Sequence, residues 1–384
     1  MSKFKYTTVT AVVVANMIGT GVFTSLGFQL LDIQSGFVLL MLWAVGGIIA
    51  LSGAMTYAEL GAAMPRSGGE YNFVTRIYHP AVGFASGWVS ATVGFAGPTA
   101  LAAMIFAAYA LPSTASDGNT WVHKTLACSL IVILTLVHAS TRRNSGGLQV
   151  VFTVLKVAVI VAFCIAALWV TDTPQPVRFM FASEDVPLLT SGAFAVSLIY
   201  VSYAYTGWNA ATYLSGELQD PQRTLPGILM AGTAIVMLLY LALNYVFLRV
   251  APIEEMVGQV EVGYIAATAA FGEFGGRFTG LVLSALLIST VSAMTVAGPR
   301  VLQVVGEDIS QLRLLAKTNK DGVPAIAIFV QSGLAILFIL TSDVRSLLVF
   351  SGFILALNSF VTVLGVYVLR YRQPELPRPC LLYT

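Results

Sequence analysis

The stretch Asn16-Met17-Ile18-Gly19-Thr20-Gly21-Val22-Phe23 lies in the first long apolar run of the chain, residues 8–30. Glycine weakens a helix and lowers the steric cost of unusual backbone angles. Two glycines near the middle of such a run therefore predict that a helix is interrupted there. A later run, residues 188–214, contains Tyr203-Ala204-Tyr205-Thr206-Gly207-Trp208-Asn209, which also has a glycine near its middle.

The composition indicates what surrounds these two stretches. Of the 384 residues, 57% are hydrophobic and 10% are charged, whereas roughly a quarter of the residues of a soluble domain are charged. Ten apolar runs come close to the ~20 residues that a helix needs to cross a ~30 Å hydrocarbon core. The sequence therefore predicts an all-α, polytopic protein in a lipid bilayer, with helices over residues 8–30, 37–64, 81–111, 121–140, 148–170, 188–214, 224–250, 278–305, 324–340 and 346–369.

The runs divide into five and five around a polar stretch. We expect a first five-helix repeat over residues 1–170, an extracellular loop over 171–187, a second repeat over 188–371 and a cytoplasmic tail over 372–384. Residues 262–271 are apolar but too short to span, so they predict a lid-like segment on the outer face. Interruptions in the first helix of each half are typical of an inverted-repeat transporter, whose binding site lies where the repeats meet.

An unwound membrane segment suits a zwitterionic ligand. Lipid cannot satisfy the freed amide and carbonyl groups, which must therefore face protein or a polar ligand. The carboxylate of an amino acid fits the N-terminal end of a half-helix, and its ammonium fits the carbonyls at a C-terminal end. The alternative is that the glycines merely allow close helix packing, as small residues commonly do in membranes.

The basic residues indicate an orientation. The chain has 20 Lys and Arg residues, of which Lys156 alone lies deep within an expected helix. Fourteen of the others fall on the side of both termini and five on the opposite side. Because cytoplasmic loops carry an excess of Lys and Arg, the sequence predicts a multi-pass protein of the cell membrane with both termini in the cytoplasm.

Four motifs carry a family resemblance: Ile18 to Phe23; Tyr57-Ala58-Glu59-Leu60-Gly61 followed by Pro65 to Tyr71; Tyr203 to Asn209; and Gly216-Glu217 with Asp220-Pro221, Arg223 and Leu225-Pro226. In this order they resemble the amino acid, polyamine and organocation (APC) transporter superfamily, and within it the L-type amino acid transporter-like permeases. The resemblance implies a five-plus-five inverted-repeat (LeuT-like) core with discontinuous helices over 8–30 and 188–214. Relatives usually carry two further helices, to which a homodimer contact would belong, so this sequence is either naturally short or truncated.

The resemblance also implies that main-chain groups of the two interrupted helices hold the substrate. The amide groups of Thr20 and Gly21, with the Thr20 hydroxyl, would hold its carboxylate. Tyr203 stands where relatives have an aromatic gate; the alternative is a core aromatic whose hydroxyl finds a partner. The other implied site residues are the carbonyls around the ammonium, those of Ile18, Tyr203, Ala204 and Thr206, and the glycines of the breaks, Gly19 and Gly207.

Lys156 lies about 12 Å along the helix predicted over 148–170, at 1.5 Å per residue. A charge at that depth is costly unless it is paired, which makes it a functional candidate; the alternative is that its stem snorkels to the interface. In sodium-coupled relatives a cation occupies this region, and in sodium-independent ones a lysine does. Lys156 resembles that lysine, and Ser289 and Ser292, which share a helix face, would supply hydroxyl acceptors.

Glu59 lies near the cytoplasmic end of the helix over 37–64. Arg66, Arg76 and Arg223 are its expected partners in an inner-gate ion pair, and an interfacial, solvated carboxylate is the alternative. Residues 65–70 carry turn signals, with Gly68-Gly69 allowing a sharp reversal, and we expect a cytoplasmic loop there.

Other classes of function lack their signatures. The sequence has no His-Glu-x-x-His zinc motif and no phosphate-binding loop, and no basic helix for nucleic acid. We therefore expect no enzyme activity, cofactor, metal site or nucleic-acid partner. No carboxylate is expected in the site core to pair with a cationic side chain. The sequence favours a sodium-independent exchanger of small neutral amino acids over a proton-coupled symporter and over a sodium-coupled symporter.

Overall fold

The computed structural model describes residues 6–66, 68–111, 120–140, 145–209, 211–212, 218 and 220–376. Within these residues, eight helical segments are long and apolar enough to cross a membrane, and two further apolar helices are shorter. Together they correspond to the ten predicted spans. The motif residues Gly216 and Glu217 and the end of the predicted tail, residues 377–384, lie outside the described residues.

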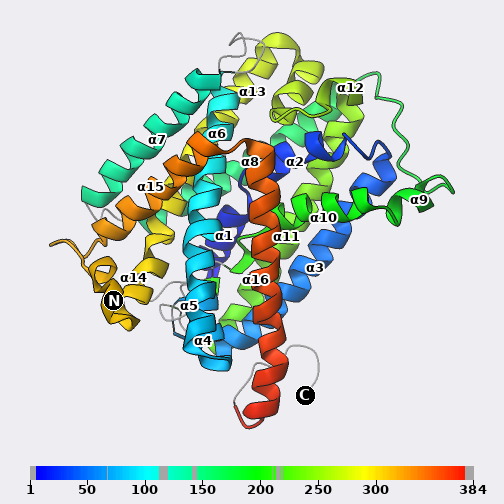
Figure 1. Ribbon diagram of the computed structural model, residues 1–384. Helices are drawn as coiled ribbons and strands as arrows, with labels where there is room; N and C mark the ends of the chain where they lie inside the picture. Colours follow the sequence, from blue (N-terminus) through cyan, green and yellow to red (C-terminus); the bar gives the residue numbers. More distant parts are fainter. Residues whose placement is uncertain are drawn as a thin grey trace.

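Helices of the first half follow the predicted order, and two of the runs are divided (Figure 1). The first run forms α1 and α2, and the third is interrupted by the π-helical segment η1. The elements are α1 (Tyr6–Met17), α2 (Gly21–Gln29), α3 (Gly36–Ala63), α4 (Gly69–Ile77), α5 (Pro80–Val89), η1 (Ser90–Ala96), α6 (Gly97–Ala110), α7 (Thr120–Ser140) and α8 (Ser145–Val170).

In the second half, the segment predicted as lid-like begins a long helix. Gly272 has φ of 73°, which bends α13 and separates residues 262–271 from the membrane-length part that follows. The elements are α9 (Asp185–Leu189), α10 (Gly192–Tyr205), α11 (Pro221–Val250), α12 (Ile253–Met256), α13 (Val262–Ala297), α14 (Pro299–Asp308), the 3₁₀ segment η4 (Ser310–Ala316), α15 (Ala325–Thr341) and α16 (Val344–Arg372).

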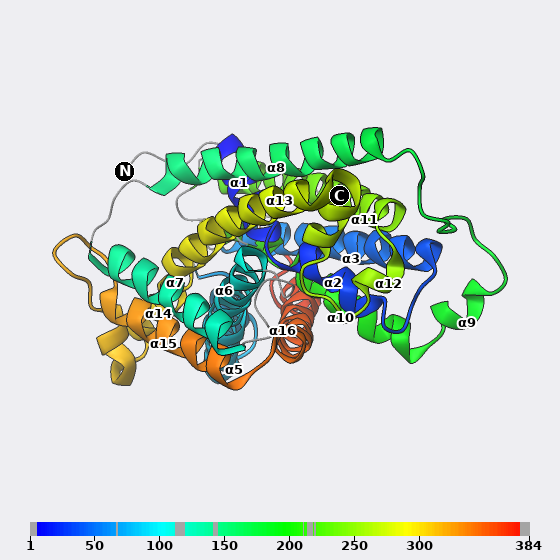
Figure 2. The ribbon, with the colours of Figure 1, turned by 90° about the horizontal axis from the view of Figure 1, so that it is seen from above.

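The helices pack in two groups. In the α3 group, α11 packs on α1 and α3, and α3 packs on α10; in the α6 group, α6, α7, α13 and α15 pack on one another. Figure 2 shows α7 and α15 on one side of the molecule and α3 and α11 on the other. Helices α8 and α16 contact members of both groups. Relative motion of the two groups would therefore be felt at α8, at α16 and at α2, which contacts α10 and α11 of the α3 group and α13 of the α6 group.

One end of the molecule, called the α4 end below, contains the end of α3, the start of α4 and the end of α16 (Figure 1). The predicted loop over residues 65–70 is shorter than expected. Gly68 has φ of 122° and makes the turn, but Glu70 already lies in the first turn of α4. Because α4 packs against α5 and α16, it carries Glu70 into the interior, where only 3% of the residue is exposed.

Candidate functional site

The first apolar run is broken where Gly19 and Gly21 predict it. Helix α1 ends at Met17 and α2 begins at Gly21. Within the break the Gly19 amide turns back to the Met17 carbonyl, at 2.7 Å. Because the first amide groups of a helix have no acceptor within it, the start of α2 directs such groups into the break.

The second break follows α10, which ends at Tyr205. Thr206 is extended, with ψ of 147°, and Gly207 has φ of 107°, a conformation that side chains other than hydrogen rarely allow. The helix predicted over 188–214 is therefore shorter than expected. The last carbonyls of α10 therefore lack the amide groups of a following helical turn as donors.

The two breaks lie against each other. A Cβ atom added to Gly21 would come within 2.5 Å of the Ala204 Cα atom, and one added to Gly207 within 2.7 Å of the Asn16 carbonyl oxygen. Neither position therefore has room for a side chain. The predicted interruption and the alternative of close packing both hold, because the same glycines serve both purposes.

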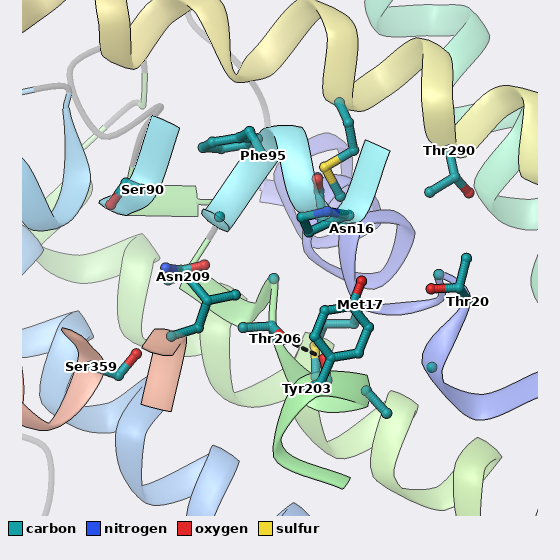
Figure 3. A pocket seen from close by; sticks show the side chains of 18 of the residues that line it. Asn16, Met17, Thr20, Ser90, Phe95, Tyr203, Thr206, Asn209, Thr290 and Ser359 are labelled. Atoms are coloured by element: carbon teal, nitrogen blue, oxygen red, sulfur yellow. Dashed lines mark hydrogen bonds between the residues drawn. The ribbon is translucent and has the colours of Figure 1, made fainter. Parts of the chain in front are cut away.

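A cavity of about 70 Å³ lies between the breaks. Figure 3 shows Ser90, Asn209 and Ser359 on one side of it, Thr20 and Thr290 on the other, and Tyr203 and Thr206 between them. Tyr203 is buried, with 6% of the residue exposed. Of the main-chain site residues that the resemblance implies, the cavity is lined by Gly19, Thr20, Gly21, Tyr203, Ala204, Thr206 and Gly207; Ile18 is not among its lining residues.

Several carbonyls freed by the breaks already accept hydrogen bonds. The buried Tyr240 hydroxyl on α11 lies within hydrogen-bonding distance of the carbonyls of Met17, at 2.5 Å, and Ala204, at 3.1 Å. The Tyr203 carbonyl accepts from both the amide and the hydroxyl of Thr206. Nothing in the sequence distinguishes Tyr240 from other membrane tyrosines, and the sequence analysis missed it.

The Lys156 side chain reaches the first break from α8. Only 3% of the residue is exposed, and its Nζ atom donates to Thr290 Oγ1 at 2.7 Å and to the Ile18 carbonyl at 3.4 Å. The ammonium is thus buried beside the break, and it does not snorkel. It joins α8, the α1–α2 break and α13.

The serines expected to contact Lys156 lie elsewhere. Ser289 donates to the Leu286 carbonyl of its own helix, and Ser292 is hydrogen bonded to His138 on α7. Thr290 makes the contact instead. Successive residues of a helix are about 100° apart around its axis, so the face of α13 that meets Lys156 is the one that carries Thr290.

Comparison with known proteins agrees with this geometry. The family model described as Amino acid permease matches residues 4–384. The chain belongs to the amino acid permease family. The match confirms the resemblance stated from the motifs, and with it an all-α, polytopic transporter fold and the expectation that the protein is not an enzyme.

Individual relatives of this permease are similar along most of their length. The b(0,+)-type amino acid transporter 1 of Mus musculus is 27% identical over 376 residues, which cover 96% of this chain and 76% of that protein. The large neutral amino acids transporter small subunit 2 of Homo sapiens is 29% identical, covering 96% and 70%. The serine/threonine exchanger SteT of Bacillus subtilis is 27% identical, covering 94% and 81%.

At the α4 end of the permease, Glu59 has a different partner from those predicted. Its carboxylate accepts from Arg370, Oε1 from Nε at 2.9 Å and Oε2 from Nη2 at 2.6 Å. Arg66 instead pairs with Asp308 at 2.9 Å, and Arg223 pairs with Asp220 at 3.6 Å. The ion pair at the α4 end therefore joins α3 to the end of α16 through Arg370, which is none of the predicted partners Arg66, Arg76 and Arg223, and that expectation is wrong.

The permease also buries a carboxylate that the sequence analysis placed in a loop. Glu70 lines the cavity, which corrects the expectation that the site core holds no carboxylate. The signal that misled is the glycine pair before it, which indicates a turn but not where the next side chain points. Five side chains donate to this carboxylate, those of Tyr57, Ser90, Asn209, Asn358 and Ser359.

Proposed function

We propose that this permease exchanges small neutral L-amino acids by alternating access without using sodium. The observation that carries the proposal is the buried Lys156 ammonium, which donates to the Ile18 carbonyl and the Thr290 hydroxyl. A fixed positive charge at the unwound segment supplies what a bound cation would supply there. On this view no sodium ion is needed to hold the α1–α2 break against α13.

The start of α2 is the proposed site for the substrate carboxylate. Amide groups at Thr20 and Gly21, with the Thr20 hydroxyl, are directed into the break, and the positive end of the helix dipole favours an anion. A carbonyl oxygen has two lone pairs, so the Ala204 carbonyl, which lies near the Tyr240 hydroxyl, can accept a second bond. With the Thr206 carbonyl it forms the proposed ammonium site, whereas the Ile18 carbonyl is used by Lys156.

The size of the cavity supports a small substrate. About 70 Å³ is available, and one water needs roughly 10–15 Å³ on this measure. The cavity is therefore well above the size that admits a single water and is still small, which favours a small amino acid over a large one. Tyr203, at the edge of this space, is the proposed aromatic gate over the bound substrate.

The surroundings of Glu70 support a neutral substrate. A carboxylate offers about four acceptor sites, and five side chains already donate to this one. A cationic side chain would have to displace one of them. The name of SteT, which refers to the exchange of serine and threonine, agrees with the proposal. The name of the human relative agrees in the neutral charge of the substrate but refers to large amino acids.

We further propose that the α4 end faces the cytoplasm and that residues 171–187 lie outside the cell. The excess of Lys and Arg at the α4 end supports this orientation. Both termini would then be cytoplasmic, and the Glu59–Arg370 pair would contribute to an inner gate.

Proton-coupled uptake is the second candidate. Among the residues that the structure describes, the recorded partners of Lys156 are neutral oxygens, and no carboxylate is paired with it. An ammonium that can lose its proton would release Ile18 and Thr290 together. Such coupling would make the state of the α1–α2 break depend on the proton gradient.

Counterflow in proteoliposomes tests both candidates. Purified protein is reconstituted into proteoliposomes that contain one unlabelled amino acid. The accumulation of each of a panel of labelled amino acids is then followed with and without sodium and proton gradients. The proposal expects labelled alanine, serine or threonine to accumulate in sodium-free buffer, and to do so only when the vesicles contain unlabelled amino acid. Accumulation driven by a proton gradient alone supports the second candidate, and a strict sodium requirement contradicts both.

A further inference from the structure

The cluster formed by Glu70 and its five donors stands at the α4 side of the cavity. Of the six residues, Glu70, Ser90, Asn209 and Ser359 also line the cavity. The cluster includes contacts of 2.5 Å from the Tyr57 hydroxyl and 3.0 Å from the Ser90 hydroxyl. The cluster therefore forms part of the cavity wall on this side.

The number of donors indicates what the carboxylate does. With five donors for about four acceptor sites, it has no capacity left to recognise a substrate ammonium. A buried charge is costly unless hydrogen bonds compensate it, and here the compensation comes from neutral side chains of separate elements. Glu70 therefore holds those elements together and is not arranged to bind substrate.

The elements that meet at Glu70 belong to different packing groups. Tyr57 lies on α3 and Asn209 follows α10, both of the α3 group. Ser90 begins η1, which runs directly into α6 of the α6 group, and Asn358 and Ser359 lie on α16, which contacts both groups. The carboxylate thus bridges the boundary between the two groups.

A second contact between separate elements lies next to the first. Tyr71, the neighbour of Glu70 in α4, donates from its hydroxyl to Asp308 Oδ2 at 2.9 Å, and Arg66 donates to Oδ1 at 2.9 Å. Asp308 is the last residue of α14. Contacts of α4 and of the turn before it therefore close the α4 side at two successive levels.

We propose that Glu70 is a positioning residue that keeps the α4 side of the cavity closed, and that the cavity opens to this side only when its five donors separate. The inference deepens the proposed function and rests on its alternating access. It assigns the inner closure of the cavity to the Glu70 cluster in addition to the Glu59–Arg370 pair. Weakening the cluster therefore shifts the population toward a form open at the α4 end.

Sided labelling of a single cysteine tests the proposal. Cys128, Cys164 and Cys380 are replaced by alanine, and Met294→Cys places a reporter in the cavity outside the cluster. A membrane-impermeant maleimide is applied to right-side-out and inside-out vesicles without substrate. Glu70→Gln is expected to raise labelling from the α4 side by about tenfold, the shift expected for losing one hydrogen bond to a charged group.

The same variant is expected to reduce labelling from the opposite side. A merely structural role would not produce opposite changes at the two faces. Tyr57→Phe, which removes one donor and keeps the carboxylate, should shift labelling in the same direction by a smaller factor. Glu273→Gln is the matched control, because Glu273 is an exposed carboxylate that pairs with Arg277 on the surface of α13, and it should leave both rates unchanged.

Unchanged labelling at both faces in a monodisperse Glu70→Gln protein would overturn the proposal. If that variant does not fold, Tyr57→Phe and Ser359→Ala decide in its place, because each removes a single donor. The readout does not depend on transport. If Glu70→Gln shows the labelling shift but the parent protein shows no counterflow of amino acids, the proposed function is contradicted. If the parent exchanges amino acids but Glu70→Gln shows no shift, the role of Glu70 is contradicted.

Discussion

Thr290 Oγ1 on α13 lies 2.7 Å from Lys156 Nζ on α8, and the same ammonium donates to the Ile18 carbonyl in the first break. A single hydroxyl therefore links the positive charge at the site to the α6 group. A hydrogen bond to a charged group contributes more than one between neutral groups. The Lys156–Thr290 contact is consequently a sensitive point for substitution.

Thr290→Val removes this hydroxyl and keeps the shape of the side chain. Losing one hydrogen bond to a buried ammonium is expected to cost ~1.5–3 kcal/mol, and sodium-free exchange should fall by about tenfold or more. Initial rates in proteoliposomes measure the effect. Ser289→Ala is the control and should retain exchange, because the Ser289 hydroxyl bonds only within its own helix. Equal losses in the two variants would contradict the assignment of Thr290.

Gly207→Ala tests the close contact of the two breaks. The added Cβ would meet the Asn16 carbonyl, and φ of 107° is itself strained for alanine. We expect a loss of ~1–3 kcal/mol in stability from the backbone alone and loss of amino acid binding. Thermal unfolding in detergent and equilibrium binding of labelled serine measure the two effects.

The control for that variant is Gly333→Ala in α15, where an added Cβ meets nothing within 4 Å. Replacing a helical glycine with alanine should leave binding intact and raise stability by roughly 0.5–1 kcal/mol. A Gly207→Ala protein that melts and binds like the parent would show that the breaks can separate without cost.

Tyr240→Phe removes the hydroxyl that lies between the carbonyls of Met17 and Ala204. Leaving a buried acceptor without its donor costs ~1–3 kcal/mol, so the variant should melt at a lower temperature. Bound substrate should restore part of this difference, because its ammonium can donate to the Ala204 carbonyl. Tyr367→Phe, at an exposed ring on α16, should melt like the parent, and the same melting temperature for Tyr240→Phe would exclude this role.

Asp185 predicts a pH dependence outside the membrane spans. The Ser35 hydroxyl, the Ala182 amide and the Arg178 guanidinium hold the pKa of the Asp185 carboxyl below its ordinary value. A carboxyl with a lowered pKa in the folded state stabilises the protein above its unfolded pKa, ~3.9, and loses this effect as the pH falls through the folded pKa. Asp185→Asn should therefore lower the melting temperature at pH 7 and converge with the parent in acid.

An exposed carboxylate of the same segment provides the comparison for that experiment. Asp172→Asn should show no such convergence, because Asp172 is exposed. A difference between Asp185→Asn and the parent that stays constant as the pH falls from 7 to about 2, well below the unfolded pKa of ~3.9, would mean that the ionised carboxylate does not stabilise this loop.

Features set by local chemistry could be predicted from the sequence. Hydropathy gives the spans, and Gly19, Gly21 and Gly207 mark the breaks because backbone freedom is a property of the residue itself. The depth of Lys156 follows from its distance to the end of its run. These predictions need no knowledge of which helices are neighbours.

Features set by packing could not be predicted. Thr290 and not Ser289 meets Lys156 because the rotation of α13 decides which face points inward. Arg370 pairs with Glu59 across 311 residues of sequence, and no local pattern carries that pairing. Glu70 was missed because its position depends on how α4 packs beneath the cavity, which the turn before it does not determine.

Equilibrium binding to the purified permease in sodium-free choline buffer tests the central claim most directly, namely that Lys156 takes the place of a sodium ion beside the two breaks. The account predicts saturable binding of a labelled small neutral amino acid, with an affinity that does not change when sodium replaces choline. Binding that is absent in choline and appears on addition of sodium would contradict it.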